Sequence, residues 1–196
     1  VCVYGNIHGP TGGQSIPALD YFLAPGVGKS YVSNICQVLE DRFDIEDDLK
    51  AEIKSELRKH LKEMNYHMIS DNGSEVVYNV LGAKGYSKED CDIVMKKALK
   101  KTEKDTYQSM EALVHNLNSM HSRAGAQVPF TSVNLGTDIS EEGRMVTRNL
   151  LLATEAGLGA GETAIFPISI FKVKEGVNYN PEDPNYDLFK LSMRVS

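Results

Sequence analysis

The chain has 196 residues, of which 41% are hydrophobic and 24% are charged, so it can form a folded core and is not broadly disordered. Its net charge of −6, from 21 basic and 27 acidic residues, argues against nucleic-acid binding, which needs a basic surplus. No apolar run approaches the ~20 residues of a membrane-spanning helix. The three cysteines form no CxxC and no Cys/His cluster, which argues against a zinc site and favours a reducing cytoplasm.

The two ends of the sequence predict a piece of a longer protein. The chain begins Val-Cys-Val without Met, and residues 187–196 have helical apolar spacing with no Gly or Pro stop after them. We therefore expect part of a larger enzyme or a trimmed domain.

The first half of the chain reads as helical. A glycine-rich loop over 1–14 leads to a helix that starts at an N-cap Ser15 and runs toward Phe43, with a kink predicted at Pro25 and Gly26. Residues 44–64 are the clearest helix, because one apolar residue recurs every fourth position along a single stripe. The stripe consists of Ile45, Leu49, Ile53, Leu57 and Leu61.

The next segments predict a turn and two more helices. Residues 70–73 (Ser-Asp-Asn-Gly) are typical of a turn, and 74–81 of a short helix. Ser87 and Asp90 resemble a capping box that opens a long helix reaching about residue 120. That helix is expected to be about 50 Å long.

The last third changes character. Residues 127–135 are β-prone, 140–156 predict a helix, and the nearly all-apolar 163–173 predicts a strand buried on both faces. A strand–helix–strand order implies a parallel pair joined by a right-handed crossover, with the prolines at strand ends. The predicted fold class is α/β, with a helical region over 1–120 and a β-α-β region over 121–196 in one incomplete domain.

Common catalytic motifs are absent or incomplete. Residues 24–30 (APGVGKS) end like a phosphate-binding loop, but Leu23 stands where the first glycine is required and the stretch lies in a helical pattern. There is no GxGxxG and no GxSxG, and His115 and His121 have no partner nucleophile on a sharp turn. No pair of carboxylates indicates acid–base catalysis.

The most unusual segment is 121–127 (HSRAGAQ), at the predicted junction between helix and strand. Arg123 and Gln127 are long hydrogen-bonding side chains among small residues. Ligands of α/β folds bind at such loops, and the guanidinium fork suits phosphate. A tight crossover in which the arginine pairs with a carboxylate is an equal alternative.

Five segments together resemble the anaerobic (class III) ribonucleoside-triphosphate reductases. They are HSRAGAQVPFTSVNLGTD (121–138), EGRMVTRNLLLATEAGLG (142–159), IFP (165–167), FKVKEGVNYNPEDPNYDLFKL (171–191) and GGQSIPALDYFLAPGVGKSY (12–31). The matches are long and specific, and the similarity is weakest over about 40–105.

This resemblance implies a fold and a chemistry. The family folds as a ten-stranded α/β barrel and reduces ribonucleoside triphosphates to deoxyribonucleotides for DNA synthesis. A glycyl radical generates a cysteine thiyl radical that abstracts the ribose 3′-hydrogen, and an iron–sulfur, S-adenosylmethionine-dependent activase installs the glycyl radical. The resemblance also implies a homodimer whose helices bind ATP or dNTP effectors, and zinc near the far C-terminus.

The same resemblance carries over to few residues of this sequence. It implies that Lys29 and Ser33 contact effector phosphates and that Arg123, Gln127 and Asn134 line the barrel near the substrate. None of Cys2, Cys36 and Cys91 matches the family's radical or zinc motifs. The chain is therefore expected to hold no catalytic residue, with the glycyl radical and the zinc elsewhere in the protein, and to be inactive alone.

Two alternatives stay open at this point. The chain could serve only as a non-catalytic helical module for nucleotide binding or dimerisation. An unrelated α/β hydrolase or kinase is the third hypothesis, and the missing nucleophile elbow and phosphate loop speak against it.

Overall fold

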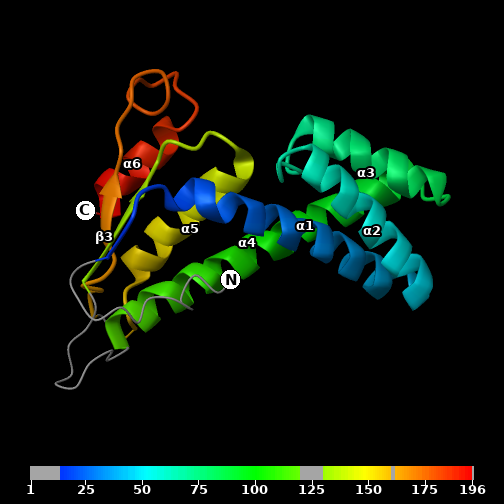
Figure 1. Cartoon of the computed structure of the whole chain (residues 1–196), viewed down its shortest axis with the longest axis horizontal. Coiled ribbons are helices and arrows are strands. Elements are labelled where there is room, and N and C mark those ends of the chain that lie inside the picture. Colours follow the sequence, from blue (N-terminus) through cyan, green and yellow to red (C-terminus); the bar gives the residue numbers. More distant parts are fainter. Residues whose placement is uncertain (1–13, 120–129, 160–161, 196) are drawn as a thin grey trace. The chain divides into compact units, whose positions relative to one another are not determined.

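The computed structural model describes residues 14–119, 130–159 and 162–195 (Figure 1). Its elements in chain order are β1 (Gln14–Ile16), α1 (Leu19–Phe43), α2 (Asp47–Glu63), α3 (Asp71–Ala83), α4 (Lys88–Ser119), β2 (Thr131–Leu135), α5 (Glu141–Ala156), β3 (Ile168–Phe171) and α6 (Tyr186–Val195). They form two compact units. The described residues of unit 1 come from within Val1–Phe22, Thr106–Ile139 and Gly143–Ser196, and those of unit 2 from Leu23–Asp105 and Ser140–Glu142.

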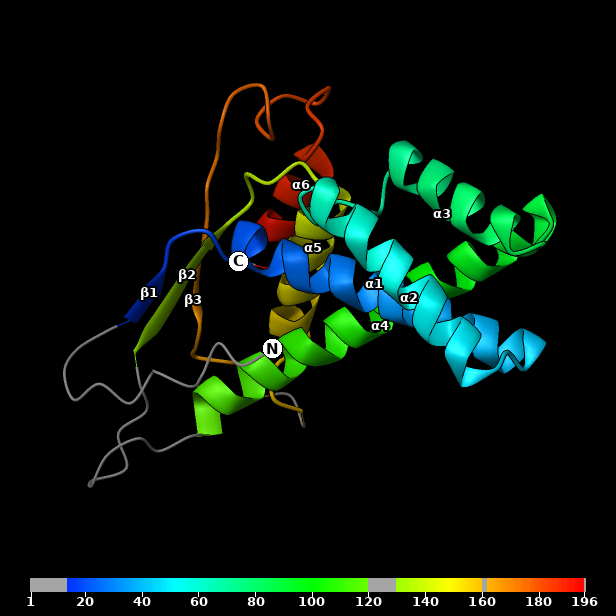
Figure 2. The same ribbon diagram turned by 45° about the vertical axis from the view of Figure 1, so that its right-hand side comes forward.

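Unit 1 is built on a three-stranded parallel sheet in the order β1-β2-β3 (Figure 2). The pairing of β2 with β3 through α5 confirms the predicted strand–helix–strand crossover. Helix α5 buries Val146 and Leu150, and β2 buries Val133 and Leu135. The predicted final helix is also present, as α6.

The start of α1 differs from the prediction. Ser15 is not a helix N-cap: it lies in β1 and pairs with Ser132 of β2. A strand of three residues carries too little alternation to be recognised from sequence, whereas Ser15 followed by Pro17 is typical of a helix start. The helix begins at Leu19 and contains Pro25.

Strand β3 also corrects the prediction, which was a strand buried on both faces. It is only four residues long, and Ile168 and Ile170 are 53% and 46% exposed. Pro167 immediately precedes it, as expected for a proline at a strand end. The apolar run is long because it also includes Phe166, which is buried before the strand starts.

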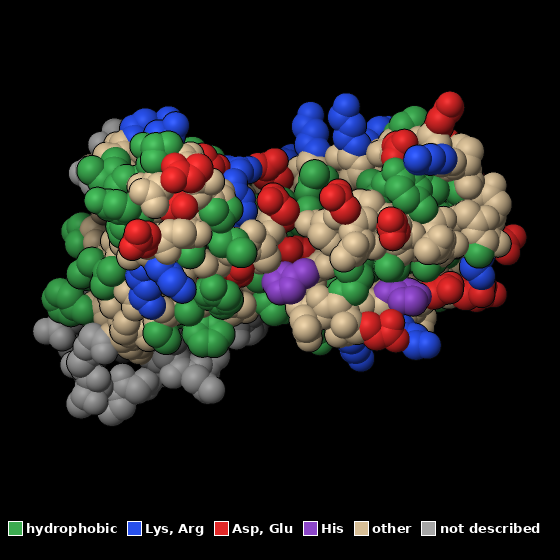
Figure 3. All heavy atoms as spheres, turned by 90° about the horizontal axis from the view of Figure 1, so that it is seen from above, with side chains coloured by type: hydrophobic (Ala, Val, Ile, Leu, Met, Phe, Trp, Pro, Cys, Tyr) green, Lys and Arg blue, Asp and Glu red, His purple; other side chains and the backbone are tan. Residues whose placement is uncertain are grey.

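The molecular surface mixes the two signs of charge. On the face drawn in Figure 3, acidic and basic side chains alternate with apolar groups, which fits the modest net charge of −6. Among the described residues, the helices are all too short or too polar to cross a membrane.

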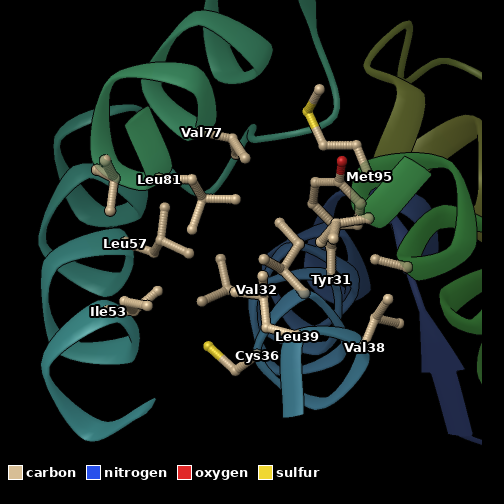
Figure 4. Close-up of a cluster of buried hydrophobic side chains, with 14 of the residues drawn as sticks. Tyr31, Val32, Cys36, Val38, Leu39, Ile53, Leu57, Val77, Leu81 and Met95 are labelled. Atoms are coloured by element: carbon tan, nitrogen blue, oxygen red, sulfur yellow. The ribbon is translucent and has the colours of Figure 1, made fainter. Parts of the chain in front are cut away.

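Unit 2 is held together by an apolar cluster contributed by α1, α2, α3 and the first half of α4 (Figure 4). The predicted stripe of α2 supplies Ile53, Leu57 and Leu61, all at most 1% exposed. Side chains labelled in Figure 4 from α1, such as Val32 and Leu39, point toward this stripe. Since each fully buried aliphatic side chain contributes about 1.5–3 kcal/mol, this cluster is the main source of stability in unit 2.

Helix α3 starts three residues earlier than predicted. Ser70 is its N-cap, and the serine hydroxyl accepts a hydrogen bond from the Gly73 backbone N–H at 3.1 Å. The predicted turn over 70–73 was therefore wrong, because the same residue types serve both turns and helix caps. A side chain at Gly73 would approach the Met68 carbonyl oxygen to 2.0 Å, so packing requires the glycine there.

Helix α4 begins as predicted. The Ser87 hydroxyl accepts from the Asp90 backbone N–H at 3.1 Å and donates to the Asp90 carboxylate at 2.6 Å. Asp90 also pairs with Arg42 at 3.2 Å, and these contacts lower the pKa of the Asp90 carboxyl, the Ser87 hydrogen bond most of all. The 32 residues of α4 correspond to about 48 Å.

Candidate functional site

One face of the sheet is not covered by described residues. The register pairs Ser132 with Ile168 and Asn134 with Ile170, so these four side chains lie on the same face. Because side chains alternate along a strand, Val133 and Leu135 of β2 point to the opposite face. They are at most 1% exposed, whereas the two isoleucines are about half exposed. The open face therefore combines a hydroxyl and an amide with two apolar side chains.

The carboxyl end of β2 is fixed by a buried carboxylate. Asp20, in the first turn of α1, is fully buried, and its Oδ2 accepts hydrogen bonds from the backbone N–H groups of Gly136, Thr137 and Asp138 at 2.9, 3.1 and 3.1 Å. Three N–H donors around one oxygen satisfy the charge without a cation. Asp20 thus sets the path of the chain directly after β2.

Two buried asparagines hold the carbonyl groups of the same loop. The Asn178 amide donates to the carbonyl oxygens of Gly136 and Lys172, each at 2.8 Å. The Asn185 amide donates to the carbonyl oxygens of Gly136 and Asp138, at 3.2 and 2.8 Å. The loop after β2 is consequently bonded through both its donors and its acceptors.

An arginine on α5 supports this arrangement. Arg144 donates to the Asn185 side-chain oxygen at 2.7 Å and to the Pro184 carbonyl, and it pairs with Asp187 at 3.0 Å. Because its fork makes these bonds at once, it orients the amide of Asn185 toward the loop. Rigid loops at the carboxyl ends of parallel strands are where α/β folds bind ligands.

The start of β3 is set by Asn118 near the end of α4. Its Oδ1 accepts from the backbone N–H groups of Ile165 and Phe166, at 2.9 and 3.0 Å, and its amide donates to the Phe166 carbonyl at 2.6 Å. The side chain therefore substitutes for a strand partner just before Pro167. Nothing in the local sequence marks Asn118 for this role, because its partners lie 47 and 48 residues away.

The stretch that ends like a phosphate loop is helical. Residues 24–30 lie within α1, which confirms that they do not form a P-loop. Gly28 is there for packing: a side chain at this position would approach the Tyr66 carbonyl oxygen to 2.3 Å. Lys29 is exposed with its ammonium 5.1 Å from the centre of the Tyr66 ring, and Ser33 follows one helical turn later, half-buried.

The described residues contain only part of the predicted substrate-facing set. Asn134 lies on the open sheet face, whereas Arg123 and Gln127 fall outside the described residues, as does His121. His115 is half-buried on α4. The roles predicted for Lys29, Ser33, Arg123, Gln127 and Asn134 stay predictions.

Cysteine and metal chemistry have no evident place in the described part of the chain. Cys36 and Cys91 are free thiols, each 1% exposed, within the apolar cluster of unit 2. Burial raises the pKa of both thiols, which opposes formation of a thiolate. The described residues also contain no group of three or more His, Cys, Asp or Glu side chains that could hold a metal.

A second buried carboxylate lies in unit 2. Glu142 is 1% exposed and accepts from the Ile69 backbone N–H at 2.7 Å, with the His67 ring nitrogen at 3.4 Å from its other oxygen. Burial, with a smaller contribution from the Glu142 charge, raises the pKa of Tyr31 to about 12. These contacts read as structural, because their polar groups bond to one another or to the backbone.

Comparison with known proteins shows which family the chain resembles. The family model described as "Anaerobic ribonucleoside-triphosphate reductase" matches residues 6–196. Similar proteins of that name occur in Enterobacteria phage T4 (39% identity, 50% of this chain and 16% of the relative), Salmonella typhimurium strain LT2 (34%, 50% and 14%) and Haemophilus influenzae strain Rd (29%, 78% and 18%).

The chain belongs to the anaerobic ribonucleoside-triphosphate reductase family. It spans less than a fifth of the length of these curated relatives, at 14–18%. The resemblance seen in the sequence is thereby confirmed.

Proposed function

We propose that the protein containing this chain reduces ribonucleoside triphosphates to deoxyribonucleoside triphosphates, and that these residues form part of the wall around the nucleotide. The observation that carries the proposal is the family match over residues 6–196, joined by curated relatives that are all named for this activity.

The sheet of unit 1 is proposed to be three strands of a ten-stranded barrel. Two physical features support this. Parallel sheets are normally covered on both faces, yet Ile168 and Ile170 leave one face of this sheet open. Strands β1 and β3 are also the edges of the described sheet, so each has one row of backbone donors and acceptors that further strands would satisfy.

Within such a barrel the open face would line the substrate cavity. Ser132 and Asn134 offer a hydroxyl and an amide, which can donate to and accept from ribose hydroxyls, while the two isoleucines would exclude water. Arg123 and Gln127 precede β2 in the chain and are proposed to contribute to the same substrate cavity. The hydrogen-bonded loop after β2 would hold Asn134 in a fixed position on the surface of the substrate cavity.

The radical groups are proposed to come from elsewhere in the protein. Cys36 and Cys91 are poor candidates because both are buried in a helical core with raised thiol pKa values. When present, a glycyl radical and a thiyl radical would supply the hydrogen abstraction from ribose. An iron–sulfur activase that installs the glycyl radical, and zinc in another segment, belong to the same proposal.

The effector proposal concerns α1. Lys29 and Ser33 are one helical turn apart, so an ammonium and a hydroxyl face the same side of the helix. This pairing suits the phosphates of ATP or a dNTP, with α1 close to the contact between two subunits of a homodimer. The cation–π contact with Tyr66 would hold Lys29 in place before the nucleotide arrives.

The deciding experiment uses the full-length protein, activated without oxygen, with reduction of the four ribonucleoside triphosphates as the readout. Asn134→Ala is expected to lower kcat/KM by about tenfold or more, since a hydrogen bond to substrate is lost. Asn79→Ala, on the exposed side of α3, is the matched control and should leave the rate unchanged. No reduction of any ribonucleotide by the activated wild type would reject the proposal.

Effector binding is tested on the 196-residue chain itself, by calorimetry with dATP, dGTP and dTTP. Binding that is weaker in Lys29→Ala than in the unchanged chain supports the effector proposal. Binding in this assay, combined with an activated full-length protein that reduces nothing, would instead favour a purely nucleotide-binding module.

A further inference from the structure

A basic groove runs along the solvent face of α2, well separated in sequence from β1–β3. It is open to solvent, has a volume of about 530 Å³ and is lined by Ala51, Lys54, Ser55, Arg58, Lys59 and Lys62. These residues recur at intervals of three and four, so they lie on one face of the helix. Ala51 and Ser55 are small and leave room between the long side chains. The remaining four lining residues are all cations.

The four cations have no ion-pair partner among the residues that the structure describes, which sets them apart from their neighbours. Elsewhere in unit 2, Lys50 pairs with Glu40, Lys84 with Glu52 and Arg42 with Asp90. On α2 itself, Glu63 is engaged by His60 at 3.0 Å. The cations of the groove therefore face solvent and one another.

This arrangement carries an electrostatic cost that an anion would remove. Like charges one helical turn apart repel each other and destabilise a helix. Lys54 and Arg58 form one such pair, and Arg58 and Lys62 the next. The chain as a whole has a net charge of −6, so this cluster of four cations runs against the overall balance of charge.

We propose that this groove binds a polyphosphate chain, either as inorganic tripolyphosphate or as the triphosphate of a nucleotide. Four ammonium and guanidinium groups along one groove match several linked phosphates better than a single anion. The volume lies in the range of small-molecule sites, about 300–1,000 Å³. The lining has no aromatic ring and no amide, so the groove recognises phosphates and ignores the base.

This lack of base recognition separates the groove from a site that selects among nucleotides. Its effect would be to raise the local concentration of triphosphates at the protein surface. The inference depends on the charges of α2 alone and is independent of the proposed reductase activity.

The test is calorimetry on the 196-residue chain with tripolyphosphate, ATP and adenosine. The variant is Arg58→Gln/Lys62→Gln, and both positions are exposed, so the fold is expected to persist. The control is Lys96→Gln/Lys100→Gln on α4, which removes two exposed lysines at the same spacing and the same total charge. Circular dichroism verifies that each variant keeps the helical content of the wild type.

We expect tripolyphosphate and ATP to bind with similar affinity, adenosine not to bind, and added salt to weaken both complexes. The groove variant should bind tripolyphosphate about tenfold more weakly or worse, and the control should match the wild type. The proposal is overturned if tripolyphosphate does not bind the wild type, or if the two variants lose equal affinity for tripolyphosphate.

Discussion

Asp20 Oδ2 lies 2.9 Å from the backbone nitrogen of Gly136, although 116 residues separate the two in the chain. The same oxygen accepts from Thr137 and Asp138, so one carboxylate holds three consecutive N–H groups. This single side chain couples the start of α1 to the end of β2.

Removing this carboxylate should destabilise the protein strongly. In Asp20→Ala, three backbone donors lose their acceptor, two of them on buried residues, and each unsatisfied buried group costs about 1–3 kcal/mol. We expect the free energy of unfolding to fall by about 3 kcal/mol or more, measured with urea. Asp41→Ala, at an exposed position of the same helix, should change it by less than about 0.5 kcal/mol. Equal losses in the two variants would contradict the structural role.

Replacing each of two helical glycines by alanine should change the stability of the protein in opposite directions. A side chain at Gly28 would meet the Tyr66 carbonyl oxygen at 2.3 Å, so Gly28→Ala forces backbone apart and should cost about 1–3 kcal/mol. At Gly82 in α3 there is no atom within 4 Å, so Gly82→Ala should stabilise by up to about 1 kcal/mol through helix propensity. Thermal unfolding of both variants provides the measurement. A stable Gly28→Ala protein would show that α1 does not contact the turn at Tyr66.

Alkaline pH should destabilise unit 2 through Tyr31. Its pKa is raised from 10.0 to about 12, so the neutral phenol is favoured in the folded state. The stabilising contribution is complete below pH 10 and declines as the pH rises toward 12, because the unfolded chain releases the proton first. By pH 11 the loss is about 1.4 kcal/mol. Urea unfolding at pH 9 and 11 should show a smaller decline for Tyr31→Phe than for the wild type, and identical declines would refute the assignment.

The two buried thiols should resist alkylation. Cys36 and Cys91 are each 1% exposed, and burial raises both thiol pKa values, so few thiolates are present at neutral pH. Iodoacetamide at pH 7 should modify both slowly in the native protein and rapidly in urea. Mass spectrometry of the peptides identifies each site. Rapid native modification of Cys36 would mean that the helical core opens more readily than its packing indicates.

Periodic segments were predictable from sequence because their signals are local. The stripe of α2 and the Ser87 capping box need only a few neighbouring residues, and both are present, except that Ile45 lies before the first residue of α2. The parallel pairing of β2 and β3 through α5 likewise followed from the strand–helix–strand order of the sequence patterns.

The errors and omissions arise from contacts between distant residues. The three residues of β1 carry no recognisable period, so the sequence predicts a helix cap at Ser15 instead of a strand. Whether the isoleucines of β3 are covered depends on other elements and not on their own hydrophobicity. Asp20 and Asn118 were missed as organising residues because a carboxylate in a first helical turn, or an amide near a helix end, ordinarily faces solvent.

The course of the chain through unit 2 has a consequence for how this protein family can diversify. The polypeptide passes from unit 1 into unit 2 within α1 and back into unit 1 within α4, and the detour between Phe43 and Lys88 belongs entirely to unit 2. The hydrogen bonds that define the strands and the loop after β2 use no residue of that detour. The lengths and surface charges of α2 and α3 can therefore change in evolution while the strands and the loop after β2 keep their hydrogen bonds.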